Sequence, residues 1–173
     1  MSEDLLKDIK EDFFHRVIFE YLYKEAEAVV GEMAARQLLY KIMKDSSKEA
    51  VNKYKDQITK VVDPTKPCES FKMIYKAFGI NDVQCEVKGN KAHLVIRNCP
   101  LPGAYDKERS GRACIVMTAI VAGMVEAMMG KKVYLETPKV RFGTKDYDIA
   151  VKMKKNIVMG DPHCEFEAEI VKP

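Results

Sequence analysis

The sequence lacks several features that would place it quickly in a class. No apolar run approaches the length of a membrane span, and the opening residues, Met1 to Lys7, lack the apolar core of a signal peptide. The longest weakly charged stretch, residues 113–130, is interrupted by Glu126. These absences predict a cytoplasmic protein with no membrane partner.

Blocks of charge of one sign are also absent. The chain of 173 residues carries 29 Lys and Arg against 26 Asp and Glu, and the two signs are interspersed. A nucleic-acid interface normally needs a basic stripe or patch, so nucleic acid is not an expected partner. With 47% hydrophobic residues the chain has enough apolar material for a core, which argues against disorder.

Motifs for disulfide frameworks, nucleotides and common nucleophiles are missing too. The five cysteines, at positions 68, 85, 99, 114 and 164, form no CxxC pair. Their odd number, without a secretion signal, argues against a disulfide framework. There is no phosphate-binding loop or dinucleotide glycine fingerprint. None of the three histidines stands in a recognised arrangement with a Cys or Ser.

The first third of the chain has the pattern of helices. Apolar residues recur at helical spacing over residues 5–21, and no proline precedes Pro64. Gly31 predicts one interruption. A second is predicted at Ser46-Ser47-Lys48-Glu49, where Ser followed three residues later by Glu is typical of a capping box that starts a new helix. A short helix over residues 71–78, stopped by a glycine, closes this region.

From residue 83 the apolar period changes to two. Strands are predicted over residues 83–87 and 92–97, with a tight turn between them, and a helix over about 107–129 follows. Four more strands are predicted at residues 132–136, 139–142, 147–153 and 164–171. The last strand has apolar residues on one face and three glutamates on the other, which is typical of a sheet with one wet face.

The predicted fold class is therefore α+β, with N-terminal helices followed by an antiparallel sheet packed against one buried helix. Residues 1–66 form the helical region, either as part of the same domain or as a dimerisation extension. Residues 67–173 form the main domain.

The buried helix carries a stripe of small residues. Ala119, Gly123 and Ala127 recur at four-residue spacing, so the sheet, a partner helix or a ligand can approach its backbone closely. Tight packing within the core is the ordinary interpretation. Met117 and Met124 on the same helix add adaptable surface, which suits an apolar ligand or an ordinary core equally well.

The last third of the chain holds the most reactive side chains. Cys114 lies in the first turns of the helix, where backbone amides favour a thiolate, although buried free cysteines are commonly inert. Glu136 ends a strand, where a solvated carboxylate is the default. Gly160-Asp161-Pro162 builds a turn followed directly by His163 and Cys164, two residue types that bind metals. Neighbours on a strand face opposite ways, so these two bind one ion only if His163 is still in the turn.

These residues resemble a known family. The similarity covers roughly residues 70–172, and the chain resembles the 4-vinyl-reductase domain, also called the hydrocarbon-binding domain. The resemblance implies a fold akin to subunits of the vesicle-tethering TRAPP complex, a hydrophobic cavity and a tendency to form homodimers. Members include phenol- and hydrocarbon-sensing modules of bacterial regulators. The motifs that carry it are Cys114, Ala122-Gly123-Met124-Val125-Glu126, Gly130-Lys131-Lys132-Val133, Glu136 and Gly160-Asp161-Pro162-His163-Cys164-Glu165-Phe166.

The same resemblance implies a structural zinc ion, because some sensor members hold one with cysteines and a glutamate. Cys114, Glu136 and Cys164 match three of those ligands, whereas the fourth family cysteine is Lys139 here. A structural zinc normally takes four ligands, so Cys99 or His163 would have to complete the site.

The ending Gly-Asp-x-x-Cys-Glu-Phe also resembles a thiazoline-carboxylate hydrolase-like family. That resemblance implies an enzyme, a cysteine- or metal-dependent hydrolase using Cys164 with His163 or Cys114. A third alternative is a structural dimerisation module with a filled core and no cavity.

The sequence favours a sensory or carrier domain that binds a small apolar or aromatic ligand and lacks catalytic machinery of its own. Any signalling output would need a protein partner that the sequence does not identify. The pocket is expected between the helix and the sheet, with a volume of about a few hundred Å³. Its expected lining is Met117, Val121, Met124 and Phe166, with Tyr134 and His93 as polar groups.

Overall fold

The computed structural model describes residues 17, 21–58, 60, 63, 66–77, 79–98, 107–138 and 140–172, and for residues 77 and 107–113 it describes the backbone alone. Several sequence predictions lie outside the described residues: the helical pattern of residues 5–16, and the roles of Phe78, Cys99 and Lys139.

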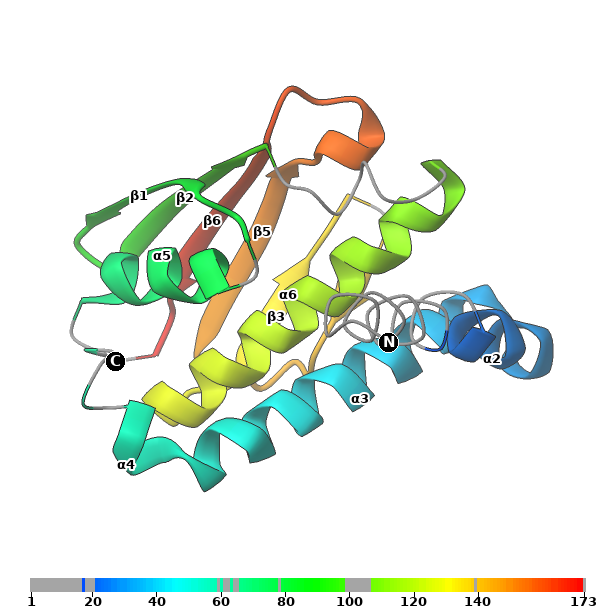
Figure 1. Cartoon of the computed structure of the whole chain (residues 1–173), viewed down its shortest axis with the longest axis horizontal. Helices are drawn as coiled ribbons and strands as arrows, with labels where there is room; N and C mark the ends of the chain where they lie inside the picture. The colour runs from blue at the N-terminus through cyan, green and yellow to red at the C-terminus, as the bar shows by residue number, and fades with distance from the viewer. Residues whose placement is uncertain are drawn as a thin grey trace, which may run out of the picture.

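The described chain forms helices followed by a six-stranded sheet, with a long helix inserted after the second strand (Figure 1). The predicted α+β class is confirmed. The helices are α2 (Leu22–Val30), α3 (Glu32–Lys53), α4 (Lys55–Ile58), α5 (Pro67–Ala77) and α6 (Lys107–Met129). The strands are β1 (Asp82–Lys88), β2 (Lys91–Arg97), β3 (Val133–Glu136), β4 (Arg141–Phe142), β5 (Ile149–Lys155) and β6 (Cys164–Ile170).

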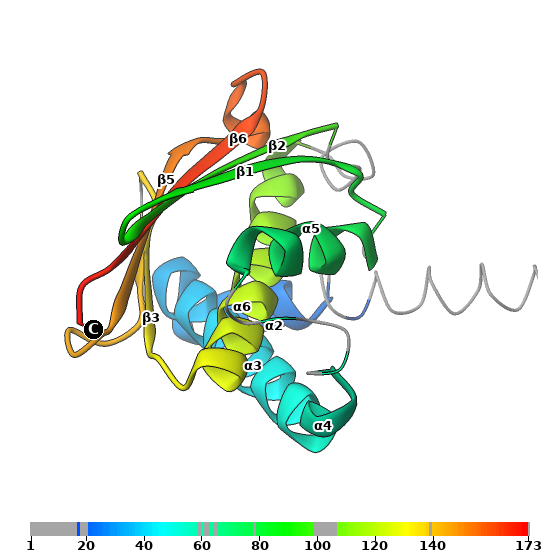
Figure 2. The same cartoon turned by 90° about the vertical axis from the view of Figure 1, so that its left-hand side faces the viewer.

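The sheet is mixed rather than fully antiparallel. Its strand order is β1-β2-β6-β5-β3-β4, and the pair β3–β5 is parallel. The prediction of a purely antiparallel sheet is wrong at this pair, because the chain returns to the start of β3 after β4. The amides of Asp148 and Ile149 both donate to the carbonyl of Lys132, each at 3.0 Å, and set that register. The described helices lie on one side of the sheet (Figure 2).

The two predicted helix interruptions have different outcomes. Gly31, with φ of 80°, separates α2 from α3 as predicted. The capping box at Ser46-Ser47 is wrong, since α3 continues through it to Lys53. The Ser47 hydroxyl instead lies 2.9 Å from the carbonyl of Lys44 in its own helix and 3.0 Å from the carbonyl of Ile120 in α6. Contact with α6 therefore holds the helix together where local sequence favours a break.

The small-residue stripe of α6 packs against α3. A Cβ atom added at Gly123 would lie 2.1 Å from both the Lys44 carbonyl oxygen and the Ser47 Oγ. Of the stripe, Ala119 is completely buried. Tyr40 of α3 stacks on Phe142 of β4 with ring centroids 4.6 Å apart. The long N-terminal helix thus shares one hydrophobic core with the sheet.

A buried carboxylate joins α6, α3 and β3. Glu126 is 5% exposed and accepts hydrogen bonds from Lys44 Nζ at 3.0 Å, Lys48 Nζ at 3.2 Å and the Val133 amide at 3.1 Å. Burial raises the pKa of Glu126, but these hydrogen bonds outweigh it and hold the pKa below its usual value. The carboxylate thereby fixes where β3 begins after α6.

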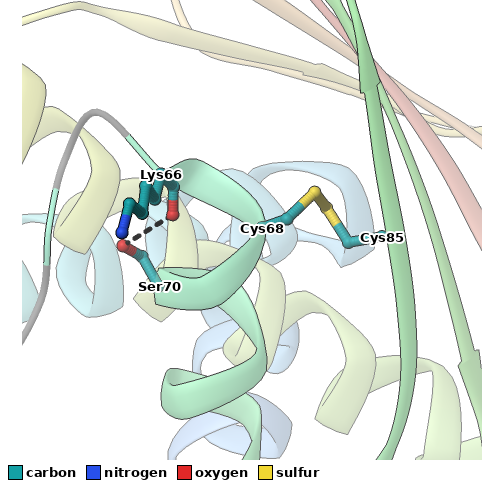
Figure 3. The surroundings of a disulfide bond; sticks show 4 residues. All are labelled: Lys66, Cys68, Ser70 and Cys85. Atoms are coloured by element: carbon teal, nitrogen blue, oxygen red, sulfur yellow. Dashed lines mark hydrogen bonds between the residues drawn. A yellow bond between two sulfur atoms is a disulfide. The ribbon is translucent and has the colours of Figure 1, made fainter.

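A disulfide bond links Cys68 of α5 to Cys85 of β1, with Cα atoms 5.3 Å apart (Figure 3). The expectation that the cysteines form no disulfide is therefore wrong for this pair. No local pattern indicates this bond, because the two cysteines, 17 residues apart, meet only when α5 folds back over the sheet edge.

Reducing this bond is expected to lower the free energy of unfolding by about 3 kcal/mol, the chain-entropy value for a loop of this size. Urea titration of the wild type with and without a dithiol reductant measures the effect. The double variant Cys68→Ser/Cys85→Ser is the control, and its midpoint should not respond to reductant. A wild-type midpoint that is equally insensitive would contradict the prediction.

None of the described helices combines the length and apolar character needed to cross a bilayer. The cytoplasmic location stays a prediction. The Cys68–Cys85 bond weighs against it, because structural disulfides are typical of oxidising compartments.

Candidate ligand-binding cavity

A cavity of about 130 Å³ lies between α6, α5 and the inner face of the sheet. We call it the apolar cavity. From the helices it is lined by Pro67, Phe71, Tyr75, Thr118, Val121, Ala122, Val125 and Met129. From the strands and the β1–β2 turn it is lined by Cys85, Val87, Gly89, Asn90, Lys91, Ala92, Leu94, Val133, Leu135, Ile149, Val151, Phe166, Ala168 and Ile170.

Two periodicities in the sequence create this lining. On β2 and β6 alternate side chains point inward, and Leu94 pairs directly with Phe166 across the two strands. On α6 the lining residues Thr118, Val121 and Val125 are spaced three and four apart, so they share one helix face. Helix and sheet therefore each present an apolar surface to the space between them.

The volume of the apolar cavity matches a single ring. An engineered protein cavity of about 150 Å³ with Leu, Ile and Phe walls stays dry and binds benzene. The cavity observed here is smaller than the few hundred Å³ expected from the sequence, which restricts its occupants to molecules of about that size.

Only some of the predicted pocket residues line the apolar cavity. Val121 and Phe166 line the apolar cavity. Met117 lines a neighbouring space of about 30 Å³, here called the small pocket. Met124 packs against the same core cluster without lining the cavity. Tyr134 stacks on Tyr147 at a centroid distance of 4.7 Å and is not among the lining residues.

His93, the other proposed polar group, points to the opposite face of the sheet. Strand alternation predicts this, since its neighbour Leu94 points inward. Sequence reasoning missed Leu94, Thr118 and the two α5 rings, Phe71 and Tyr75. The spacing of those rings marks one helix face, but no local signal says that this face covers the sheet.

A second space, the polar pocket, has a volume of about 420 Å³. Its polar lining residues are Arg36, Cys114, Thr118, Thr137 and Asn156. Its remaining lining is Ile115, Leu135, Pro138, Val140, Phe142, Met153, Val158 and Met159. The Nε of Arg36 is buried without a hydrogen-bond partner, while the guanidinium also pairs with Glu32.

Asn156, which lines the polar pocket, lies close to two thiols. Its Oδ1 lies 3.9 Å from Cys114 Sγ and 4.0 Å from Cys164 Sγ. The described lining of the polar pocket includes no His, Asp or Glu.

The four predicted zinc ligands do not converge. Cys114 and Cys164 approach each other through Asn156, but Glu136 pairs with Arg141 at 2.9 Å and His163 pairs with Glu165 at 3.2 Å. Among the described residues, no three His, Cys, Asp or Glu side chains are arranged to hold a metal ion. The described donors therefore do not fit a four-ligand site, and zinc stays a prediction that metal analysis of the purified protein would test.

A cluster of basic side chains surrounds Glu165 on the outer face of the sheet. Lys155 Nζ lies 2.7 Å from its carboxylate, His93 Nε2 3.0 Å and His163 Nε2 3.2 Å. The hydrogen bond from Lys155, followed by those from the two histidines, lowers the pKa of Glu165 to about 2. The cluster joins β2, β5 and β6.

Stability is expected to fall in acid as Glu165 is protonated. Because its pKa is lowered on folding, its contribution is complete above the unfolded value of about 4.5 and is lost as the pH falls towards about 2. Urea midpoints measured between pH 6 and pH 2.5 test this. The Glu165→Gln variant should show a shallower decline, and a decline as steep as that of the wild type would contradict the assignment.

Comparisons with known proteins relate this geometry to a fold and a family. The phenol-responsive sensory domain of the transcription activator PoxR, solved with phenol, superposes with a TM-score of 0.58 at 15% identity, covering 86% of this chain and 71% of that chain. A trafficking protein particle complex subunit 3 from Naegleria fowleri, covalently bound to palmitic acid, superposes with a TM-score of 0.52 at 13% identity. The match covers 91% of this chain and 97% of that chain. The predicted likeness to TRAPP subunits is confirmed for the fold.

At the sequence level, the family model described as L-2-amino-thiazoline-4-carboxylic acid hydrolase matches residues 10–167. This is the second of the two families that the sequence resembles. A comparison with curated protein sequences finds no match.

Proposed function

We infer that this chain, which belongs to the L-2-amino-thiazoline-4-carboxylic acid hydrolase family, binds a small apolar or aromatic compound of one ring. The observation that carries this proposal is the apolar cavity of about 130 Å³ between α6 and the sheet. The phenol-bound sensory domain of PoxR, which shares the fold, supports it by analogy. The finer assignments, a 4-vinyl-reductase type of domain with a sensory or carrier role, are part of the same proposal.

The chemistry of the lining favours a neutral ligand. Most of the lining side chains are aliphatic or aromatic, and burying apolar ligand surface against them contributes about 25 cal/mol per Å². Of the lining residues with an amide or charged side chain, Asn90 lies in the exposed turn between β1 and β2, and Lys91 begins β2, where its ammonium pairs with Glu169 at 3.8 Å. An ionised group inside the cavity would lose its hydration without a partner, which strongly disfavours charged compounds there.

Calorimetric titration with toluene, phenol and benzoate tests the proposal. Toluene and phenol are expected to bind one per chain with Kd of about 0.1 to 1 mM, which corresponds to about −5.5 to −4 kcal/mol. Benzoate, of similar shape but charged, should bind much more weakly. Failure of both neutral compounds to bind near their solubility limits would refute the proposed function.

Hydrolysis is the second candidate, favoured by the family and by the polar pocket. In that pocket the Arg36 guanidinium would hold a ligand carboxylate. Cys114 lines the same pocket. Hydrolysis ranks second because the binding proposal is supported both by the apolar cavity and by the phenol-bound sensory domain that shares the fold.

Incubation with 2-amino-thiazoline-4-carboxylate tests this second candidate. Ring-opening hydrolysis would release a thiol, which chromatography of the low-molecular-weight fraction detects. Release of many equivalents per chain, lost in Cys114→Ser, would make hydrolysis the leading function. The binding proposal expects no turnover.

The homodimer and the protein partner for any output also stay proposals. Exposed apolar side chains on α2 and α3 support a further contact surface: Val29, Val30, Met33, Leu38 and Ile42. Light scattering of the purified protein would measure the oligomeric state.

A further inference from the structure

Three spaces meet at one hydroxyl-bearing side chain of α6. Thr118 lines the apolar cavity, the polar pocket and the small pocket. It is half-buried and lies one helical turn before Val121 on the same face of α6. Among the α6 residues that line the apolar cavity, Thr118 brings the hydroxyl group, and the others are Val121, Ala122, Val125 and Met129.

A hydrogen bond within α6 limits the further hydrogen bonds that Thr118 can make. Its Oγ1 donates to the carbonyl of Cys114 at 2.6 Å, four residues earlier. A hydroxyl has one proton and two lone pairs, so with its proton used in this way it can only accept a further hydrogen bond. A partner for Thr118 in the cavity must therefore be a donor.

We propose that Thr118 determines the specificity of the apolar cavity by accepting a hydrogen bond from a ring that carries an O–H or N–H group. The ligand class is then a phenol, an aniline or a pyrrole-like heterocycle. This inference rests on the proposed function and names its substrate class more narrowly.

The surrounding residues leave few acceptors for a ligand donor in the cavity. Leu94, Leu135 and Phe166 offer no side-chain acceptor to the cavity. At its turn end, the Asn90 amide nitrogen donates to the Ile170 carbonyl at 3.1 Å. A ligand donor placed among these groups without an acceptor would lose its hydrogen bonds to water without replacement and bind more weakly. Tyr75 carries the other hydroxyl of the helical lining and is the natural competitor for the role.

Phenol and toluene test the inference as a matched pair, because an O–H replaces a methyl group on the same ring. Their Kd values would be measured for the wild type, Thr118→Val, Thr118→Ser and Tyr75→Phe. Thr118→Val keeps the shape of the side chain and should raise the Kd of phenol about fivefold, the factor expected for one neutral hydrogen bond. The Kd of toluene should change less than about twofold, since toluene donates no hydrogen bond.

The two remaining variants separate the hydroxyls. Thr118→Ser restores the acceptor and should restore most of the phenol preference, while Tyr75→Phe should leave that preference unchanged. Equal weakening of phenol and toluene by Thr118→Val would overturn the inference. So would a phenol-specific loss in Tyr75→Phe alone. Wild-type protein that binds neither compound refutes the proposed function itself, whereas equal wild-type affinities refute only the role of Thr118.

Discussion

The Val121→Trp variant is expected to lose detectable binding of toluene and phenol, a rise in Kd of at least about 100-fold, while it keeps the fold. Val121 lines the apolar cavity from the centre of α6 and is 9% exposed. The indole atoms would occupy the space of about 130 Å³ that a ring would otherwise fill. Overpacking costs about 1–3 kcal/mol in a filled core, and an existing cavity reduces that cost.

Calorimetry measures the lost affinity, and circular dichroism with thermal unfolding verifies the fold. Val29→Trp is the matched control, since Val29 is 82% exposed on α2 and the same substitution there should leave binding unchanged. Retained binding in a folded Val121→Trp protein would show that the ligand site is elsewhere.

The Gly123→Ala variant is expected to destabilise the protein by about 3 kcal/mol or more, at or above the upper end of the usual cost of overpacking a core. The new methyl group would stand 2.1 Å from the Lys44 carbonyl oxygen and from Ser47 Oγ, so α3 and α6 would have to separate. Helix propensity alone predicts the opposite sign, because Ala is favoured over Gly by about 1 kcal/mol inside a helix. The sign of the change in urea midpoint therefore decides between the two effects.

The double variant Gly123→Ala/Ser47→Gly provides the control. It removes the side-chain half of the conflict and leaves the backbone oxygen of Lys44 in place, so it should recover only part of the loss relative to Ser47→Gly. A single Gly123→Ala variant that unfolds at higher urea than the wild type would rule out the close approach of the two helices.

Local patterns predicted most of the elements, and long-range contacts account for the errors. Segments in which apolar and polar residues alternate correctly predicted β1, β2 and β6. Gly31 correctly predicted the boundary between α2 and α3. The helix break predicted at Ser46-Ser47 is wrong because the Ser47 hydroxyl donates a hydrogen bond to the Ile120 carbonyl of α6, 73 residues away in sequence. Parallel pairing of β3 with β5 likewise depends on the path of the chain through β4, and strand propensity carries no information on that path.

The position of the apolar cavity was predictable from the sequence, but most of its lining was not. Helical periodicity and strand alternation placed Val121 and Phe166 on inward faces, and both line the apolar cavity. The contribution of α5 depends on how that helix folds over the sheet, which the Cys68–Cys85 bond helps to fix. Thr118 escaped notice because a single Thr on an apolar helix is unremarkable until the cavities beside it are known.

The location of a bound ring tests the central claim most directly. Crystals of the protein soaked in bromobenzene would give an anomalous bromine signal wherever the compound binds. The expected result is a bromine peak between α6 and the sheet, beside Val121 and Phe166. A peak confined to the polar pocket beside Cys114, or an empty apolar cavity in crystals soaked to saturation, would contradict it.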